Sequence, residues 1–73
     1  MSEKEWKIKF PKQIKSILEL KKNMSQRELA KRMKISEVSV SRYLNGERIP
    51  KANVLFSMAK ALEISIIELI EFD

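Results

Sequence analysis

Residues 26–45, QRELAKRMKISEVSVSRYLN, constrain the fold more than any other segment, because their apolar residues recur at helical spacing on both sides of a short bend. Leu29 and Met33 fall on the inner face of a first helix, and Val40 and Tyr43 fall on the inner face of a second. The pattern predicts two short helices that pack against each other at an angle. It leaves the outer face of the second helix exposed.

The ends of these two helices are also predicted by local residues. Ser25 and Glu28 have the spacing of a capping box, and Ser36 is a suitable N-cap for the second helix. Gly46 follows Asn45 and accepts the left-handed conformation that commonly ends a helix, while Pro50 prevents the helix from continuing. The helices therefore have defined limits as well as a defined inner face.

Three further helices are predicted around this pair. The first begins at Pro11, because the fixed backbone angle of proline suits the first helical position, and the last opens with the capping pair Ser65 and Glu68. The first and fourth helices are marked by apolar residues at helical spacing: Ile14, Ile17 and Leu18, then Val54, Leu55, Met58, Ala59 and Leu62. We therefore expect an all-α domain of five helices over residues 11–73.

The composition is consistent with one small helical domain. A length of 73 residues leaves no room for a separate effector-binding or catalytic domain, and one glycine with two prolines favours helices over a β-sandwich. The absence of cysteine excludes disulfides and thiolate metal sites, so packing or dimerisation must stabilise the fold. The N-terminus is charged where a signal peptide is apolar, and no run approaches the roughly 18 apolar residues of a membrane span. A cytoplasmic location is expected.

Charge is distributed unevenly along the chain. Residues 1–23 hold seven lysines against three glutamates, and residues 24–50 hold six basic residues against three glutamates. From Lys51 onward two lysines face four acidic residues. This asymmetry, together with the helix pair, indicates a domain that presents one basic side to a polyanion such as nucleic acid. Taken alone, the charge favours a solvated lysine-rich surface.

The first ten residues show a different pattern. Trp6, Ile8 and Phe10 alternate with Lys7 and Lys9, which is the period-two pattern of an extended strand with one apolar side. We therefore expect a separate N-terminal extension over residues 1–10. It could pack against the helices, pair with the same strand of a second subunit, or reach along DNA as a basic arm.

Two blocks of sequence, MSQRELAKRMKISEVSVSRYLNGERIP and VLFSMAKALEISIIELI, carry a specific combination of short motifs. These are Ser-Gln-x-x-Leu-Ala, Ser-x-x-Arg, Asn-Gly and Ala-Lys-Ala-Leu. The combination resembles the lambda-repressor-like helix-turn-helix family, which includes phage repressors, Cro proteins and small bacterial XRE-type regulators. With the first helix the resemblance covers residues 11–72. It implies a five-helix DNA-binding domain and a transcriptional regulator, such as a repressor, that needs no cofactor and no metal.

The chain departs from the family pattern at a few positions. Lys34 and Glu63 stand where the family often has glycine, and a left-handed residue other than glycine costs about 1 kcal/mol or more. Glu19 and Leu44 stand where an arginine and a glutamate often pair. That ion pair is therefore not expected here.

The exposed face of the second helix of the pair is the candidate DNA-reading surface. Val38, Ser41, Arg42 and Asn45 point outward at 100° per residue, and Glu37 flanks them. By resemblance, the base-contacting positions are Glu37, Val38, Ser41 and Arg42. Arginine can donate two hydrogen bonds to guanine, glutamate can accept one from cytosine, and valine can pack on a thymine methyl. Also by resemblance, Gln26 and Asn45 contact phosphates. Arg48 and Lys51 are expected to add nonspecific attraction through their charge.

The C-terminal segment is more apolar than one face of a short helix can bury. Family members commonly dimerise through this region, which would place two reading helices roughly 34 to 36 Å apart on a palindromic operator. The interface candidates are Ile67, Ile70, Phe72, Phe56 and Trp6. Each could instead complete the core of the monomer.

Other classes of function were weighed against this one. The chain has no histidine, no cysteine and no glycine-rich phosphate loop, so an enzyme is not expected. The competing hypothesis is a protein-binding regulator, such as an anti-repressor or an antitoxin, because the second helix carries few cations. A combined role, with DNA on that helix and a second regulatory protein elsewhere, is also compatible with the sequence.

Overall fold

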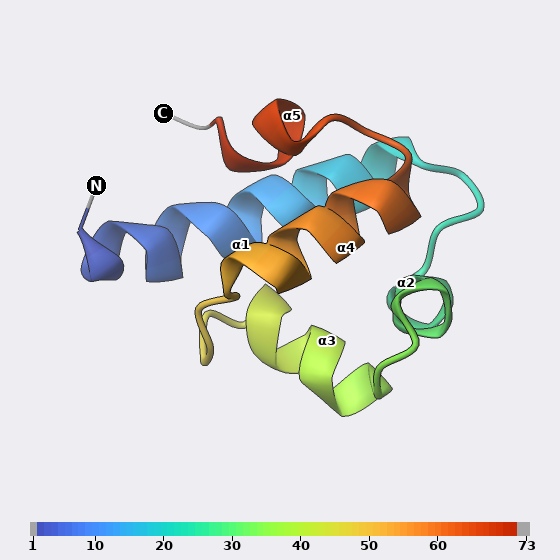
Figure 1. Ribbon diagram of the computed structural model, residues 1–73, viewed down its shortest axis with the longest axis horizontal. Coiled ribbons are helices and arrows are strands. Elements are labelled where there is room, and N and C mark those ends of the chain that lie inside the picture. Colours follow the sequence, from blue (N-terminus) through green and yellow to red (C-terminus); the bar gives the residue numbers. More distant parts are fainter. Residues whose placement is uncertain (1, 72–73) are drawn as a thin grey trace.

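Five helices and no strand form over residues 2–71, the part of the chain that the computed structural model describes (Figure 1). They are α1 (Glu3–Leu20), α2 (Gln26–Met33), α3 (Glu37–Leu44), α4 (Ala52–Leu62) and α5 (Ile66–Ile70). The expected all-α fold is confirmed. Each helix after α1 begins within one or two residues of the position that its capping residues or its apolar pattern indicate.

The N-terminal segment does not form the expected strand. Helix α1 begins at Glu3 and not at Pro11, so Pro11 lies inside the helix. The Ser2 hydroxyl caps the helix by accepting a hydrogen bond from the Glu5 backbone N–H, at 3.2 Å. Acidic residues in the first turn complement the helix dipole. The prediction of an extended segment over residues 1–10 was therefore wrong for all described residues from Glu3 onward.

Apolar packing explains why this segment is helical. Trp6 and Phe10 are four positions apart. This spacing puts two residues on the same face of a strand and also on the same face of a helix. In the helix their ring centroids lie 5.2 Å apart, and Phe10 is buried with Ile14, one further turn along. Ile8, the third member of the alternation, remains 53% exposed. The helix thus continues one buried stripe at the cost of exposing one isoleucine.

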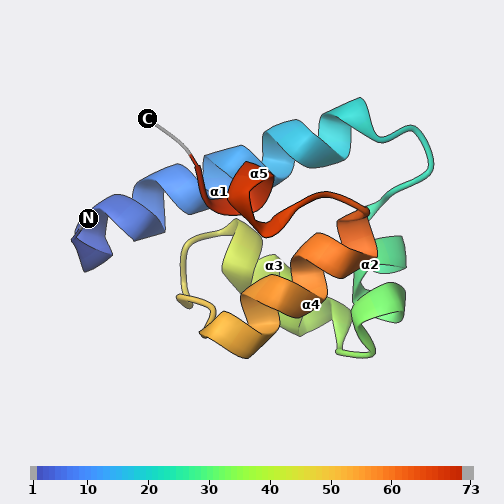
Figure 2. The same ribbon diagram turned by 45° about the horizontal axis from the view of Figure 1, so that its top comes forward.

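The core lies between α1, α4 and the α2–α3 pair, with α5 packed against α1 and α4 (Figures 1 and 2). Leu29, Met33, Val40 and Tyr43 are all buried in it, as their spacing predicts. Gln13 ties α5 to α1 by donating a hydrogen bond from Nε2 to the Glu68 carbonyl oxygen at 2.8 Å. The pair α2–α3 is therefore mounted on one side of a three-helix support. None of the helices described over residues 2–71 has the length and apolar character needed to span a membrane.

Candidate nucleic-acid interface

Helix α3 has one buried and one exposed face. Val40 is fully buried and Tyr43 and Leu44 are nearly so, whereas Val38 on the other side is 60% exposed. Glu37, Arg42 and Asn45 are also exposed, and Ser41 is half-buried beside them. The structure thus brings all five of these sequence-predicted residues to the outer side of α3 and its C-terminal end.

The polar residues of this face differ in how far they are already engaged. Ser36 caps α3 by accepting a hydrogen bond from the Ser39 N–H at 3.1 Å, so it serves the helix itself. Asn45 donates from Nδ2 to the Ser41 hydroxyl at 3.3 Å and to the Glu47 carboxylate at 3.5 Å. Glu37 and Arg42 make no ion pair within residues 2–71. These two side chains are therefore available to an external partner.

Helix α2 packs against α3 and has a capped N-terminus. Gln26 is its first residue and is half-buried. The Ser25 hydroxyl accepts a hydrogen bond from the Glu28 N–H at 3.0 Å, which is one half of the expected capping box. The other half does not form as expected, because the Glu28 carboxylate accepts a hydrogen bond from Arg32.

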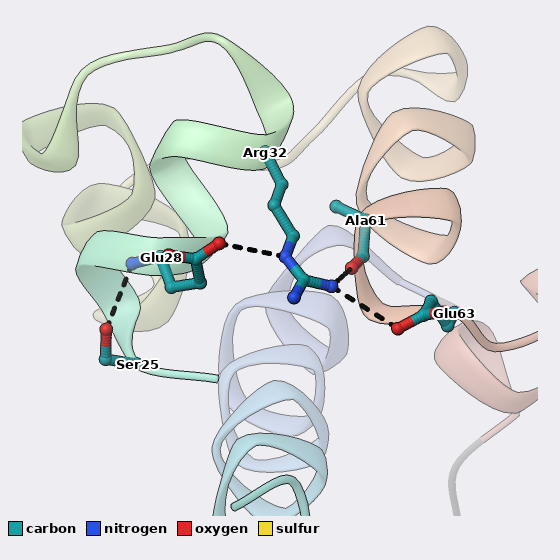
Figure 3. Close-up of polar contacts among 5 residues, drawn as sticks. All are labelled: Ser25, Glu28, Arg32, Ala61 and Glu63. Carbon is teal, nitrogen blue, oxygen red and sulfur yellow. Dashed lines mark hydrogen bonds and ion pairs between the residues drawn. The ribbon is translucent and has the colours of Figure 1, made fainter. Parts of the chain in front are cut away.

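Arg32 joins α2 to the C-terminal end of α4 (Figure 3). Its Nε donates to Glu28 at 3.0 Å, and its Nη1 donates to the Ala61 carbonyl oxygen at 3.2 Å and to the Glu63 carboxylate at 3.3 Å. The hydrogen bond to Glu28, and then the one to Glu63, raise the pKa of Arg32 above its usual value. The contacts to α4 were not anticipated.

The two positions where the family often has glycine are left-handed in this chain too. Lys34 has φ 59° and ends α2, and Glu63 has φ 58° and ends α4. The following residues close both turns, with Ile35 N donating to Ala30 O at 3.1 Å and Ile64 N donating to Ala59 O at 3.0 Å. The turn geometry is thus kept despite the side chains.

Leu44 replaces a charged residue of the family pattern, and the structure shows the consequence. Its side chain is 6% exposed and belongs to the hydrophobic core, while Glu19 is exposed. Apolar packing therefore stands where an ion pair between the first and third helices would otherwise lie.

The loop from α3 to α4 carries the remaining predicted cations. Arg48 and Lys51 are exposed, and Lys51 is the N-cap position of α4. Gly46 lies between Asn45 and this part of the loop with φ 73°, a conformation that favours glycine. The loop places its two basic residues next to the C-terminal end of α3.

The residues predicted for a dimer interface fall into two groups. Phe56 on α4 and Ile67 on α5 are 61% and 60% exposed. Trp6 and Ile70 are partly buried and pack against the core of the same chain. Phe72 lies outside the described residues. Only the first two therefore present large apolar surfaces to solvent.

Two short helices joined by a tight left-handed turn, with the second exposed along one side, define a helix-turn-helix protein. The comparison with protein families agrees: the family model described as helix-turn-helix matches residues 14–69. The chain belongs to this lambda-repressor-like helix-turn-helix family and is a DNA-binding regulator. No curated protein and no solved structure matches the chain significantly.

Proposed function

We propose that this protein is a sequence-specific transcriptional regulator of the repressor or Cro type, which binds a palindromic operator as a homodimer in the cytoplasm. The observation that carries this proposal is the exposed face of α3, where Arg42 and Glu37 have no ion-pair partner among residues 2–71. A buried opposite face fixes the orientation of the helix. Such a face fits the major groove, which admits one α-helix.

Each side chain on this face has a chemical role in the proposal. Arg42 donates two hydrogen bonds to a guanine, Glu37 accepts one from a cytosine amino group, and Val38 packs against a thymine methyl. Ser41 is half-buried and small, so it lets the helix approach the base edges closely. The four residues together would read a short half-site.

Phosphate contacts would hold α3 in this orientation. Gln26 stands at the positive end of the α2 dipole, and the exposed Asn45, Arg48 and Lys51 follow α3 on the other side. In this proposal, the two sets of residues bind phosphates on either side of the base-reading face. Such contacts set the register of the helix on DNA but do not read sequence.

Dimerisation would use the exposed apolar residues Phe56 and Ile67. A two-fold dimer presents the same patch from each subunit and spaces the reading helices by about one turn of DNA, roughly 34 to 36 Å. Trp6 and Ile70 would contribute only the parts that packing in the monomer leaves accessible. The place of Phe72 in the dimer interface is proposed from the sequence alone.

Selection from a random duplex library tests this function. We expect the purified protein to retain a palindrome, with affinity that falls steeply as salt rises. Arg42→Ala should abolish the sequence preference, whereas the matched control Lys60→Ala, which removes a cation from the last turn of α4, should not. Recovery of no preferred sequence by the wild-type protein would contradict the proposal.

A second candidate function is a protein-binding regulator, such as an anti-repressor or an antitoxin. The observation that favours it is the weak charge of α3, whose exposed face offers one arginine against one glutamate. A surface with this balance suits a protein partner as well as a groove edged by phosphates. This alternative predicts a partner complex that is lost in Arg42→Glu and a chain that selects no DNA sequence.

A further inference from the structure

Gly46, directly after the expected phosphate ligand Asn45, touches the N-terminal part of α1. A Cβ atom added to Gly46 would collide with the Lys7 carbonyl oxygen and would lie 3.4 Å from Cγ of Pro11. In both views the α3–α4 loop runs close to the N-terminal half of α1, whose first turns extend beyond the loop (Figures 1 and 2). The backbones of α1 and of the loop are therefore in direct contact at this point.

Pro11 makes this contact possible from the side of α1. Proline has no N–H, so the Lys7 carbonyl one turn earlier lacks its usual helical donor and can face the loop. Glycine offers the closest backbone approach on the other side. The pair Pro11 and Gly46 thus joins two segments that are 35 positions apart in the sequence. The family match begins only at residue 14, so this junction involves residues that the family model does not cover.

The contact determines which lysines of α1 lie near the loop. Lys4, Lys7 and Pro11 are separated by three and four residues and so form one stripe along the helix. Since Pro11 and the Lys7 backbone touch Gly46, this stripe lies on the side of the loop. Lys9 and Lys12 form a different stripe of the same helix. Each stripe has one lysine in an i,i+4 ion pair: Lys7 with Glu3 at 3.6 Å, and Lys9 with Glu5 at 3.7 Å.

We propose that Lys4 and Lys7 form an additional phosphate-binding site, which extends the DNA contact of the loop residues Asn45 and Arg48 along the same strand. The inference rests on the proposed function, because the loop must lie on the DNA backbone. Its chemistry is that of two lysine ammonium groups and one sugar-phosphate strand. A rigid helix holds these lysines, and the Gly46–Lys7 contact fixes its position relative to α3.

The test compares two double variants of the full chain, Lys4→Gln with Lys7→Gln, and Lys9→Gln with Lys12→Gln. Each removes two charges from the same helix, and each breaks one i,i+4 ion pair with a glutamate. Binding to a short mixed-sequence duplex is measured over a range of salt concentrations, and circular dichroism checks the helix content. Each phosphate contact contributes about 0.9 to the slope of log affinity against log salt.

We expect the Lys4/Lys7 variant to lower that slope by roughly 2. The Lys9/Lys12 variant loses the same net charge but no phosphate contact, so it should lower the slope by less. In an ethylation-interference experiment, ethylation of the phosphates that Lys4 and Lys7 contact should weaken binding of the wild-type protein. The same modification should not weaken binding of the first variant. Equal slopes for the two variants would overturn the proposal. If the wild-type protein itself bound no duplex, the proposed function would fail first, so the two failures are distinguishable.

Discussion

Helices α2 and α3 have eight residues each and both are capped by a serine, yet their exposed sides differ. On α2, Arg32 is held by Glu28, by the Ala61 carbonyl and by Glu63, so an exposed side chain ties the helix to α4. On α3, Glu37 and Arg42 make no ion pair within the described residues. The polar contacts of Arg32 thus stabilise the position of α2, whereas Glu37 and Arg42 on α3 remain available to a partner.

This difference predicts that α2 contributes mainly to stability and α3 mainly to recognition. Apart from Gln26, for which we propose a phosphate contact, substitutions on α2 should alter stability and affect binding only through the position of α3. Substitutions on the exposed face of α3 should alter recognition and leave the free energy of unfolding nearly unchanged, since surface changes are usually within about 0.5 kcal/mol.

The largest expected effect is that of Leu29→Ala on α2. Leu29 is fully buried, and removing a buried leucine side chain typically costs about 2 to 5 kcal/mol. Urea unfolding should show this loss, while the control Arg27→Ala on the exposed side of the same helix should stay within about 0.5 kcal/mol. A small effect for Leu29→Ala would mean that α2 does not anchor the pair.

Arg42→Lys tests whether the exposed face of α3 reads bases. Lysine keeps the charge but loses the planar pair of donors that fits guanine, so discrimination should fall by about 1 to 3 kcal/mol. Binding to the selected operator and to a mixed-sequence duplex gives this difference, and Arg27→Lys on α2 is the matched control. Equal losses on both duplexes would assign Arg42 to phosphates and contradict base reading.

Much of this architecture could be predicted from sequence because it is local. The inner faces of α2 and α3 follow from apolar residues three and four positions apart, and Ser25, Ser36 and Ser65 each accept the capping hydrogen bond that their positions indicate. The exposed face of α3 then follows from the buried one, because both lie on the same eight-residue helix.

The start of α1 was mispredicted because two periods overlap there. Trp6 and Phe10 fit a strand and a helix equally well, and Pro11 suits a first helical position although it lies inside the helix. The N-cap Ser2 and the acidic first turn favour the helix. The alternation that predicts a strand covers only five residues, Trp6 to Phe10.

The contacts that hold the site in place depend on distant parts of the chain. Glu63 reaches Arg32 across 31 residues, and Gly46 meets Lys7 across 39 positions. No periodicity links such residues, and only the folded core brings them together. The outline of the reading face was therefore predictable, whereas its attachment to α1 and α4 was not.

Lys34→Gly tests the turn that separates the two helices. Lys34 is left-handed and exposed, so glycine should relieve a strain of about 1 to 2 kcal/mol, offset in part by the greater freedom of the unfolded chain. We expect a net stabilisation of up to about 1 kcal/mol in urea unfolding. Lys31→Gly in the last turn of α2 is the opposite control and should destabilise by up to about 1 kcal/mol.

The smallest expected effect is that of Glu63→Gly, although Glu63 has nearly the same backbone angle as Lys34. The same strain is relieved, but the carboxylate that binds Arg32 is lost, so the two changes oppose each other. In an Arg32→Gln background that interaction is already absent, and Glu63→Gly should then stabilise the protein as much as Lys34→Gly does. A gain that is the same in both backgrounds would show that the Arg32–Glu63 contact adds nothing to stability, which would leave the hydrogen bond from Arg32 to the Ala61 carbonyl as the polar link between α2 and α4.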